Sequence, residues 1–198
     1  TITIASNSTG ATPVTFTSED GDGTSNGTND GLVELDTLNF TGSNSVTFLM
    51  PGDDLLLIQA EDTGASDTAA ALVISDTAMT GGTSRFEIDA AAGAATAINT
   101  RSMVVDEIAL SYTIANNETF LVGSGQNIVV AADTTTGDIN ATAPAVAGNS
   151  LTITIEDDAV ATSANDVNGG ITTSNVGTLN IAANDAANST AGGIVMGA

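Results

Sequence analysis

The sequence predicts an all-β protein, a β-sandwich or jelly-roll-like fold of many short antiparallel strands with at most one short helix. Three observations predict this class. Polar and apolar residues alternate in 1–4 (Thr-Ile-Thr-Ile) and in 151–155 (Leu-Thr-Ile-Thr-Ile), as in strands with one buried face. Similar segments recur at intervals of roughly ten residues. Gly, Asn, Asp or Ser bounds nearly all of them.

The candidate strands share a short length and β-branched or aromatic residues. In chain order they are 1–4, 13–17, 32–35, 45–50, 55–59, 70–75, 84–89, 102–105, 108–114, 119–122, 127–132, 151–155, 176–181 and 193–196. Segment 55–58 is continuously apolar, which indicates a central strand covered on both faces or one that contacts a partner. The pairs Asn26-Gly27 and Asn168-Gly169 are typical of hairpin turns.

One segment departs from the strand pattern. Asp89 is a helix-capping residue type, and the alanine-rich stretch after it favours a helix over Asp89–Asn99 or, equally, an alanine-rich loop. No internal repeat stands out, which argues against a solenoid. The chain of 198 residues is therefore expected to form a donor strand with its tether in 1–10, followed by a single β-sandwich domain in 11–198.

The composition excludes most enzyme chemistry. The chain has 24 Asp and Glu residues but only two basic ones, Arg85 and Arg101, and it has no histidine or cysteine. It therefore lacks the usual general base, a thiolate nucleophile and a Schiff-base lysine. A glycosidase-type carboxylate pair remains, but the chain has no Trp and one Tyr with which to stack a sugar. We expect a protein that is not an enzyme.

The net charge of −22 also restricts the partners. Nucleic-acid binding depends on Lys and Arg that neutralise phosphates, and two arginines cannot supply that charge. No apolar run approaches the roughly 20 residues of a membrane span, so no membrane insertion is expected. The remaining candidates are copies of the same chain, and a glycan or cell-surface polysaccharide.

A calcium site is the strongest local motif. Asp20, Asp22, Thr24, Asn26 and Asp30 offer oxygen ligands at intervals along a Gly-rich loop, and calcium takes six to eight oxygens. The loop departs from an EF-hand because Thr24 replaces an acidic or amide residue and no Glu closes it. The alternative is a solvated acidic hairpin loop.

Three further acidic clusters are weaker calcium candidates. Glu156, Asp157 and Asp158 directly follow the strand 151–155, where ligands often gather in a sandwich. The other two clusters are Asp53 with Asp54, and Glu61 and Asp62 with Asp67. Cations at such sites would relieve the repulsion among the uncompensated carboxylates.

N-glycosylation acceptors are the third kind of candidate site. The pattern Asn-x-Ser/Thr occurs six times, a number close to what chance gives in a chain so rich in these residues. The acceptors are Asn7, Asn26, Asn39, Asn117, Asn140 and Asn188.

The whole chain is dominated by Thr, Ala, Gly, Asn, Ser and Asp, with almost no basic residues. In this composition it resembles secreted bacterial or archaeal surface proteins: matrix-fibre or thread-type filament subunits, S-layer subunits and calcium-dependent adhesins. The resemblance implies an extracellular or cell-surface location and a structural role.

The first residues are candidates for assembly. Segment 1–5 is a short alternating strand followed by the polar stretch 6–10, so Ile2 and Ile4 would fill pockets if the strand completed a neighbour's sheet. The alternative is an ordinary first strand. We therefore expect a structural protein that self-assembles into a filament or pilus by strand exchange and apolar packing, stabilised by calcium. The alternatives are an S-layer lattice subunit and a calcium-dependent adhesive or carbohydrate-binding module.

Overall fold

A computed structural model describes residues 2–6, 14–17, 37–51, 55, 72–90, 97–112, 118–131, 138–156, 170–183 and 194–197. Sixteen strands lie in these residues. They are β1 (Ile2–Ser6), β2 (Val14–Thr17), β3 (Thr37–Gly42), β4 (Val46–Pro51), β5 (Val73–Met79), β6 (Ser84–Ala90), β7 (Ile98–Asn99), β8 (Met103–Val104), β9 (Glu107–Leu110), β10 (Glu118–Leu121), β11 (Gln126–Val130), β12 (Asp138–Thr142), β13 (Ser150–Ile155), β14 (Gly170–Ser174), β15 (Thr178–Ala183) and β16 (Ile194–Gly197).

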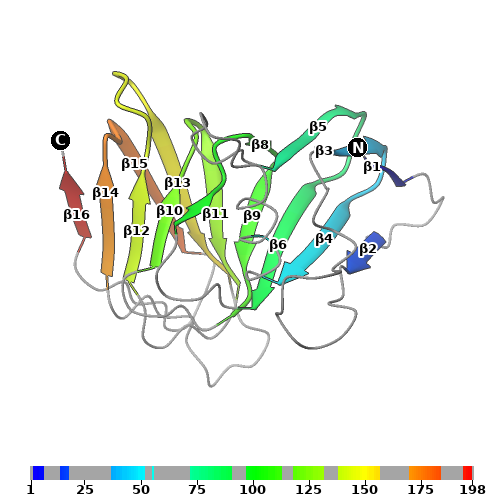
Figure 1. Cartoon of the computed structure of the whole chain (residues 1–198), viewed down its shortest axis with the longest axis horizontal. Coiled ribbons are helices and arrows are strands. Elements are labelled where there is room, and N and C mark those ends of the chain that lie inside the picture. Colours follow the sequence, from blue (N-terminus) through cyan, green and yellow to red (C-terminus); the bar gives the residue numbers. More distant parts are fainter. Residues whose placement is uncertain are drawn as a thin grey trace, which may run out of the picture.

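The strands form three sheets in which all the pairs are parallel. Their orders are β1-β3-β5-β8, β16-β14-β12-β10-β7 and β15-β13-β11-β9-β6-β4-β2. Neighbours within a sheet are separated in sequence by strands of the other sheets, so the chain leaves a sheet and returns one strand further along it. The result is a stack of coils, a parallel β-helix, with β1 and β2 at one end and β16 at the other (Figure 1).

The prediction of an antiparallel sandwich or jelly roll was wrong. Period-two alternation reports which side chains face the core, and it is the same whether neighbouring strands run parallel or antiparallel. Strand direction depends on the connections, because parallel neighbours need a crossover of a dozen residues or more. Such crossovers are present here: Phe48 pairs with Phe86, and Ile108 with Ile128.

The argument against a solenoid was also wrong, for a reason visible in the same pairs. Phe48 lies 38 residues before its partner Phe86, whereas 20 residues separate Ile108 from Ile128. The coils therefore differ in length, and no fixed period is present in the sequence to reveal them.

The predicted helix over Asp89–Asn99 is contradicted at both ends of that range, where the residues lie in strands. Asp89 belongs to β6 and Asn99 to β7, and residues 91–96 lie outside the described part of the chain. The two predicted hairpin turns, Asn26-Gly27 and Asn168-Gly169, and the predicted strand 32–35 also lie outside it. Leu55, at the start of the predicted central strand 55–59, is fully buried but does not belong to a strand, and residues 56–59 lie outside the described part.

The core contains columns of side chains stacked from coil to coil. One register position of the seven-stranded sheet is Phe or Ile in every strand. In backbone register it runs Phe16, Phe48, Phe86, Ile108, Ile128, Ile153 and Ile181. The rings of Phe48 and Phe86 are stacked, with centroids 6.1 Å apart and planes 7° from parallel. One hydrophobic cluster extends from Ile4 to Val176, so the described coils share a single core.

Short arcs lead into the strands of the seven-stranded sheet, and buried amide side chains hold them. The Gln126 carbonyl oxygen accepts hydrogen bonds from the Gly123 backbone N–H at 2.8 Å and from the Thr100 hydroxyl at 3.0 Å. Its amide nitrogen donates to the backbone carbonyls of Thr100 and Met103. Asn149 donates to three backbone carbonyls of its own and the next arc. These arcs satisfy their backbone groups with side chains, as buried irregular backbone must.

One coil, residues 97–112, joins all three sheets, and we call it the seam coil. Its β7 pairs with β10 of the five-stranded sheet, its β8 with β5 of the four-stranded sheet, and its β9 with β6 and β11. The turn between β7 and β8 is closed by a hydrogen bond of 2.9 Å from the Met103 N–H to the Thr100 carbonyl. The two smaller sheets therefore meet at this coil.

Candidate functional site

The acidic segments of the sequence share a topological position. Parallel strands end at a common edge of their sheet, and β4 and β6 point to the lower side of Figure 1. Eight of the 24 Asp and Glu residues lie in the described part of the chain, which leaves sixteen. All sixteen belong to sequence segments that connect a strand of the seven-stranded sheet to the next strand of another sheet.

The predicted calcium ligands belong to these segments. Asp20, Asp22, Thr24, Asn26 and Asp30 follow β2 in the sequence, and all five lie outside the described residues. The same holds for Asp157 and Asp158, which follow β13, and for the clusters at 53–54 and 61–67, which follow β4. In the described ranges no group of three or more acidic, His or Cys side chains is arranged to hold a metal ion.

An ion cluster around Arg85 lies on the outer side of the seven-stranded sheet. The Arg85 guanidinium contacts Glu156 through two bonds, Nη1–Oε1 at 2.7 Å and Nη2–Oε2 at 3.0 Å. Its Nε contacts Glu87 Oε2 at 3.0 Å, and its Nη1 contacts Glu107 Oε2 at 3.2 Å. We call these four residues the Arg85 cluster. It fastens β6 to β9 and to the end of β13.

Burial by itself lowers the pKa of Arg85, but the hydrogen bonds and charge of Glu156, together with the charges of Glu87 and Glu107, outweigh it. The pKa of Arg85 is therefore raised above its ordinary value, and the group stays charged at every pH at which proteins are folded. The charged guanidinium binds three carboxylates at once and so holds β6, β9 and the end of β13 together.

Replacing Arg85 with Met is expected to lower the free energy of unfolding by about 2 kcal/mol, because it leaves three half-buried carboxylates without their cation. Arg101→Met is the matched control: it removes the same charge from an exposed side chain whose bond to the Thr142 carbonyl is 3.5 Å long. Urea unfolding followed by circular dichroism measures both. Equal losses in the two variants would contradict the structural role of the Arg85 cluster.

A buried serine with two aspartates lies at the start of β6. The Ser84 hydroxyl donates to Asp76 Oδ2 at 2.5 Å, and its oxygen accepts from the Asp106 N–H at 2.8 Å. Asp106 Oδ2 in turn accepts from the Ser84 N–H at 2.9 Å. The sequence contains no histidine that could activate the serine. The arrangement is a hydrogen-bonded clamp between two sheets, and the carboxylates serve as acceptors.

A surface hollow of about 310 Å³ lies beside the arc between β12 and β13. Small apolar residues and backbone line it, with Asn175 as the polar side chain. The Asn175 amide already donates to the Ala143 carbonyl at 3.2 Å. Small-molecule sites combine an apolar wall with convergent polar groups. This hollow offers the wall without such groups.

Two predicted glycosylation acceptors lie on strands. Asn39 pairs with Thr3 and Ser75, and Asn140 with Thr119 and Thr172, so both lie half-buried in polar columns on the outer faces of their sheets. The four others, Asn7, Asn26, Asn117 and Asn188, lie outside the described residues.

The two predicted assembly residues lie in β1, which pairs in parallel with β3 of the same chain. Ile2 is opposite Leu38 and Ile4 opposite Phe40, and Ile4 is buried in the chain's own core. Within one copy β1 is therefore the first strand of the four-stranded sheet, which is the alternative that the sequence left open.

The Arg85 cluster and the buried amides Gln126 and Asn149 were not among the residues predicted from the sequence. The first had a signal: Arg85 and Glu87 are two residues apart on a strand and therefore share a face. The amides had none, because a buried Gln and an exposed Gln look the same in a single sequence.

Comparisons with protein-family models, with curated proteins and with solved structures found no match for this chain. In the part of the chain that the structure describes, no helix has the length and apolar character needed to cross a membrane.

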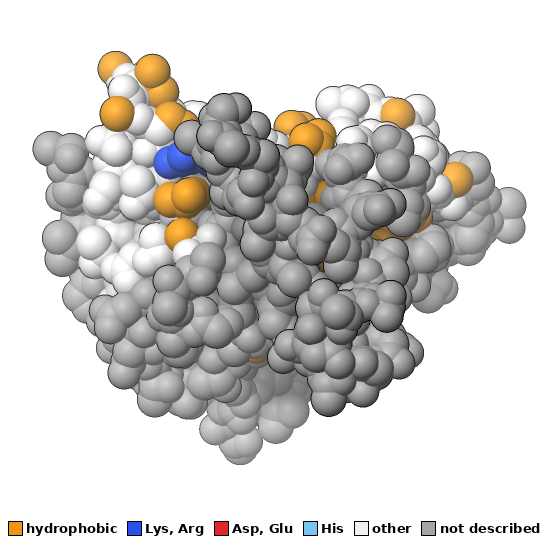
Figure 2. All heavy atoms as spheres, in the orientation of Figure 1, with side chains coloured by type: hydrophobic (Ala, Val, Ile, Leu, Met, Phe, Trp, Pro, Cys, Tyr) orange, Lys and Arg blue, Asp and Glu red, His pale blue; other side chains and the backbone are white. Residues whose placement is uncertain are grey.

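On the face shown in Figure 2, the described surface consists mainly of uncharged polar side chains and backbone, with hydrophobic side chains and a small basic area among them. Such a surface is compatible with contacts made by backbone, hydroxyl and apolar groups.

Proposed function

We propose that this protein is an extracellular structural protein whose copies assemble into a filament. The supporting observation is the architecture itself: parallel coils repeat along one axis around one continuous core, and each sheet ends in an edge strand. Repetition of this kind produces a rod, and the hydrogen-bonding edges at its ends are suited to further parallel strands. Packing and backbone hydrogen bonds maintain the rod without disulfides, since the chain has no cysteine.

The same architecture favours one second candidate, a calcium-dependent adhesive module. Sixteen carboxylates belong to segments that begin at one edge of the seven-stranded sheet, where cations would reduce the repulsion of a chain of charge −22. Calcium is also the cofactor proposed for the filament, where it would neutralise these acidic segments. A lattice of S-layer type is the planar variant of the first proposal.

Negative-stain electron microscopy and light scattering of the purified protein, with millimolar calcium and with EDTA, separate these functions. Filaments support the first proposal, and flat sheets support the lattice variant. Monomers whose melting temperature rises with calcium support the adhesive module. Monomers that calcium does not affect would overturn all three.

A further inference from the structure

The two ends of the seven-stranded sheet carry apolar residues at matching register positions. At one end Val14 and Phe16 of the edge strand β2 pair with Val46 and Phe48, and at the other end Leu179 and Ile181 of β15 pair with Leu151 and Ile153. Ile181 is 38% exposed, whereas Ile153, one coil inward in the same column, is fully buried. The core therefore ends at β15 with an apolar side chain that a further coil would cover.

The edge strands carry none of the residues that usually prevent edge-to-edge pairing. Exposed edges are normally protected by charged side chains, proline or bulges. The sequences of β15 (TLNIAA), β2 (VTFT), β1 (ITIAS) and β16 (IVMG) contain no charged residue and no proline. The chain has a net charge of −22, but these edge strands carry no charge, so two copies can bring them together without electrostatic repulsion between the strands themselves.

From these observations we infer that a second copy of the chain docks head to tail, with its β2 in parallel register on β15. This inference rests on the proposed filament and specifies its contact. Continuing the existing columns places Val14 of the second copy against Leu179, Thr15 against Asn180, and Phe16 against Ile181. Such a contact joins two different surfaces and does not close, so it extends into a filament.

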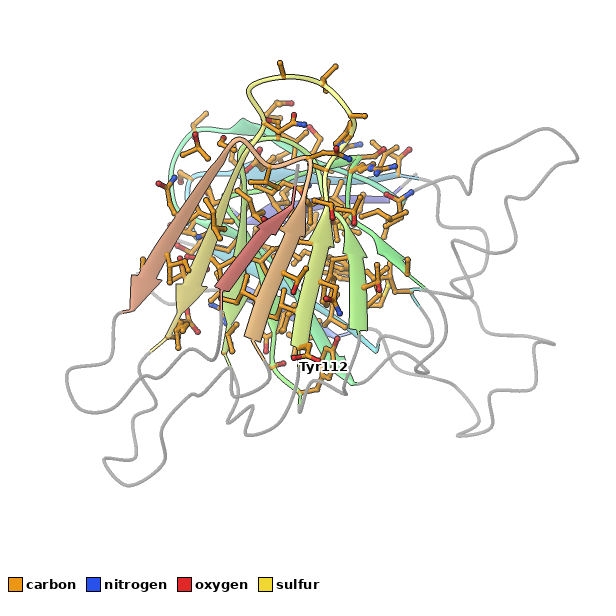
Figure 3. All side chains as sticks on the ribbon, turned by 90° about the vertical axis from the view of Figure 1, so that its left-hand side faces the viewer. Tyr112 is labelled. Carbon is orange, nitrogen blue, oxygen red and sulfur yellow. The ribbon has the colours of Figure 1, made fainter. Side chains whose placement is uncertain are left out.

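The seam coil shows how the smaller sheets fit at this junction. There, strands of the five-stranded sheet, the four-stranded sheet and the seven-stranded sheet follow one another as β7, β8 and β9. At the junction, β16 of one copy is followed by β1 and β2 of the next copy. These three strands again include one strand from each of the three sheets. Figure 3 shows β16 beside β14 at the end of the stack. The first strand is thus kept in its own sheet and not exchanged.

Cysteine cross-linking tests the register, because the natural chain has no cysteine. Thr15 and Asn180 lie in one column of the seven-stranded sheet, at its opposite edges. A mixture of T15C and N180C, treated with a short thiol cross-linker, is expected to give covalent dimers. A protein with both substitutions is expected to give a ladder. The matched control is T47C with N180C, in which Thr47 lies in the same column but inside the sheet.

The outcomes distinguish this inference from the proposed function. Filaments with a T15C/N180C ladder support both. Filaments without the ladder, or with cross-links between two T15C chains, overturn the head-to-tail register but leave the filament intact. Absence of any polymer overturns both. Ile181→Lys is expected to abolish polymers while the melting temperature of the monomer is retained, and Thr152→Lys, on an interior strand, is expected to leave polymers unchanged.

Discussion

Replacing Phe86 with alanine will lower the free energy of unfolding by about 4 kcal/mol. Phe86 is fully buried, and its ring stacks on Phe48 in the next coil. It also lies in register with Ile108 on the other side, so its removal opens a cavity between two coils. A coil stack cannot close such a cavity easily, because the hydrogen-bond ladders on both sides fix the spacing of the strands.

Chemical denaturation of Phe86→Ala followed by circular dichroism will measure this loss. The control is Val104→Ala, which removes apolar atoms from a side chain that is 55% exposed, and a change within about 0.5 kcal/mol is expected. If both variants unfold at the same denaturant concentration, the stacked column does not carry the stability that we assign to it.

Gly82→Ala will destabilise the protein by about 3 kcal/mol, whereas Gly125→Ala will cost about 1 kcal/mol. Both glycines have positive φ, +78° and +84°, so both substitutions carry the strain of a left-handed backbone. The two positions differ in the space available to an added Cβ atom. A Cβ at Gly82 would meet the backbone carbon of Asn44 and nitrogen of Ser45, whereas nothing lies within 4 Å of one at Gly125.

Both variants carry the cost of a left-handed backbone at alanine. The difference between their stabilities therefore measures the cost of the close contact between neighbouring arcs at Gly82. Thermal unfolding of both variants under identical conditions measures it. A Gly82→Ala protein as stable as Gly125→Ala would mean that the arc 80–83 does not pack on the arc 43–45 as described. Val46 N–H donates to the Thr83 carbonyl at 3.0 Å in this same contact.

The sequence predicted the strands better than their arrangement. Alternation located β1, β6 and β13 closely, because inward and outward positions follow from period two. It could not supply the direction of the neighbours, since Ile153 would face the core in either a sandwich or a coil. The pairing of Phe48 with Phe86 depends on a crossover whose sequence resembles a loop with short strands of its own.

The candidate site was predictable only at the level of composition. The acidic segments were visible as clusters, but their shared relation to the edge of the seven-stranded sheet follows from parallel topology, which the sequence did not reveal. To predict the Arg85 cluster, one would need to know that β6 lies next to β9. One would also need to know that Arg85 pairs with Glu156, which is 71 residues away in the sequence. Such long-range pairs have no signature in a single sequence.

The seam coil has a consequence for proteolysis. Trypsin cleaves after Lys and Arg, and this chain offers it Arg85, whose side chain is 17% exposed, and Arg101, which is exposed in the turn between β7 and β8. A cut after Arg101 separates the strands before the turn from those after it. The two fragments would nevertheless stay associated, because β7 pairs with β10, β8 with β5 and β9 with β6 across the cut. Cleavage at the more exposed of the two arginines is therefore expected to leave the two fragments bound to each other in the folded structure.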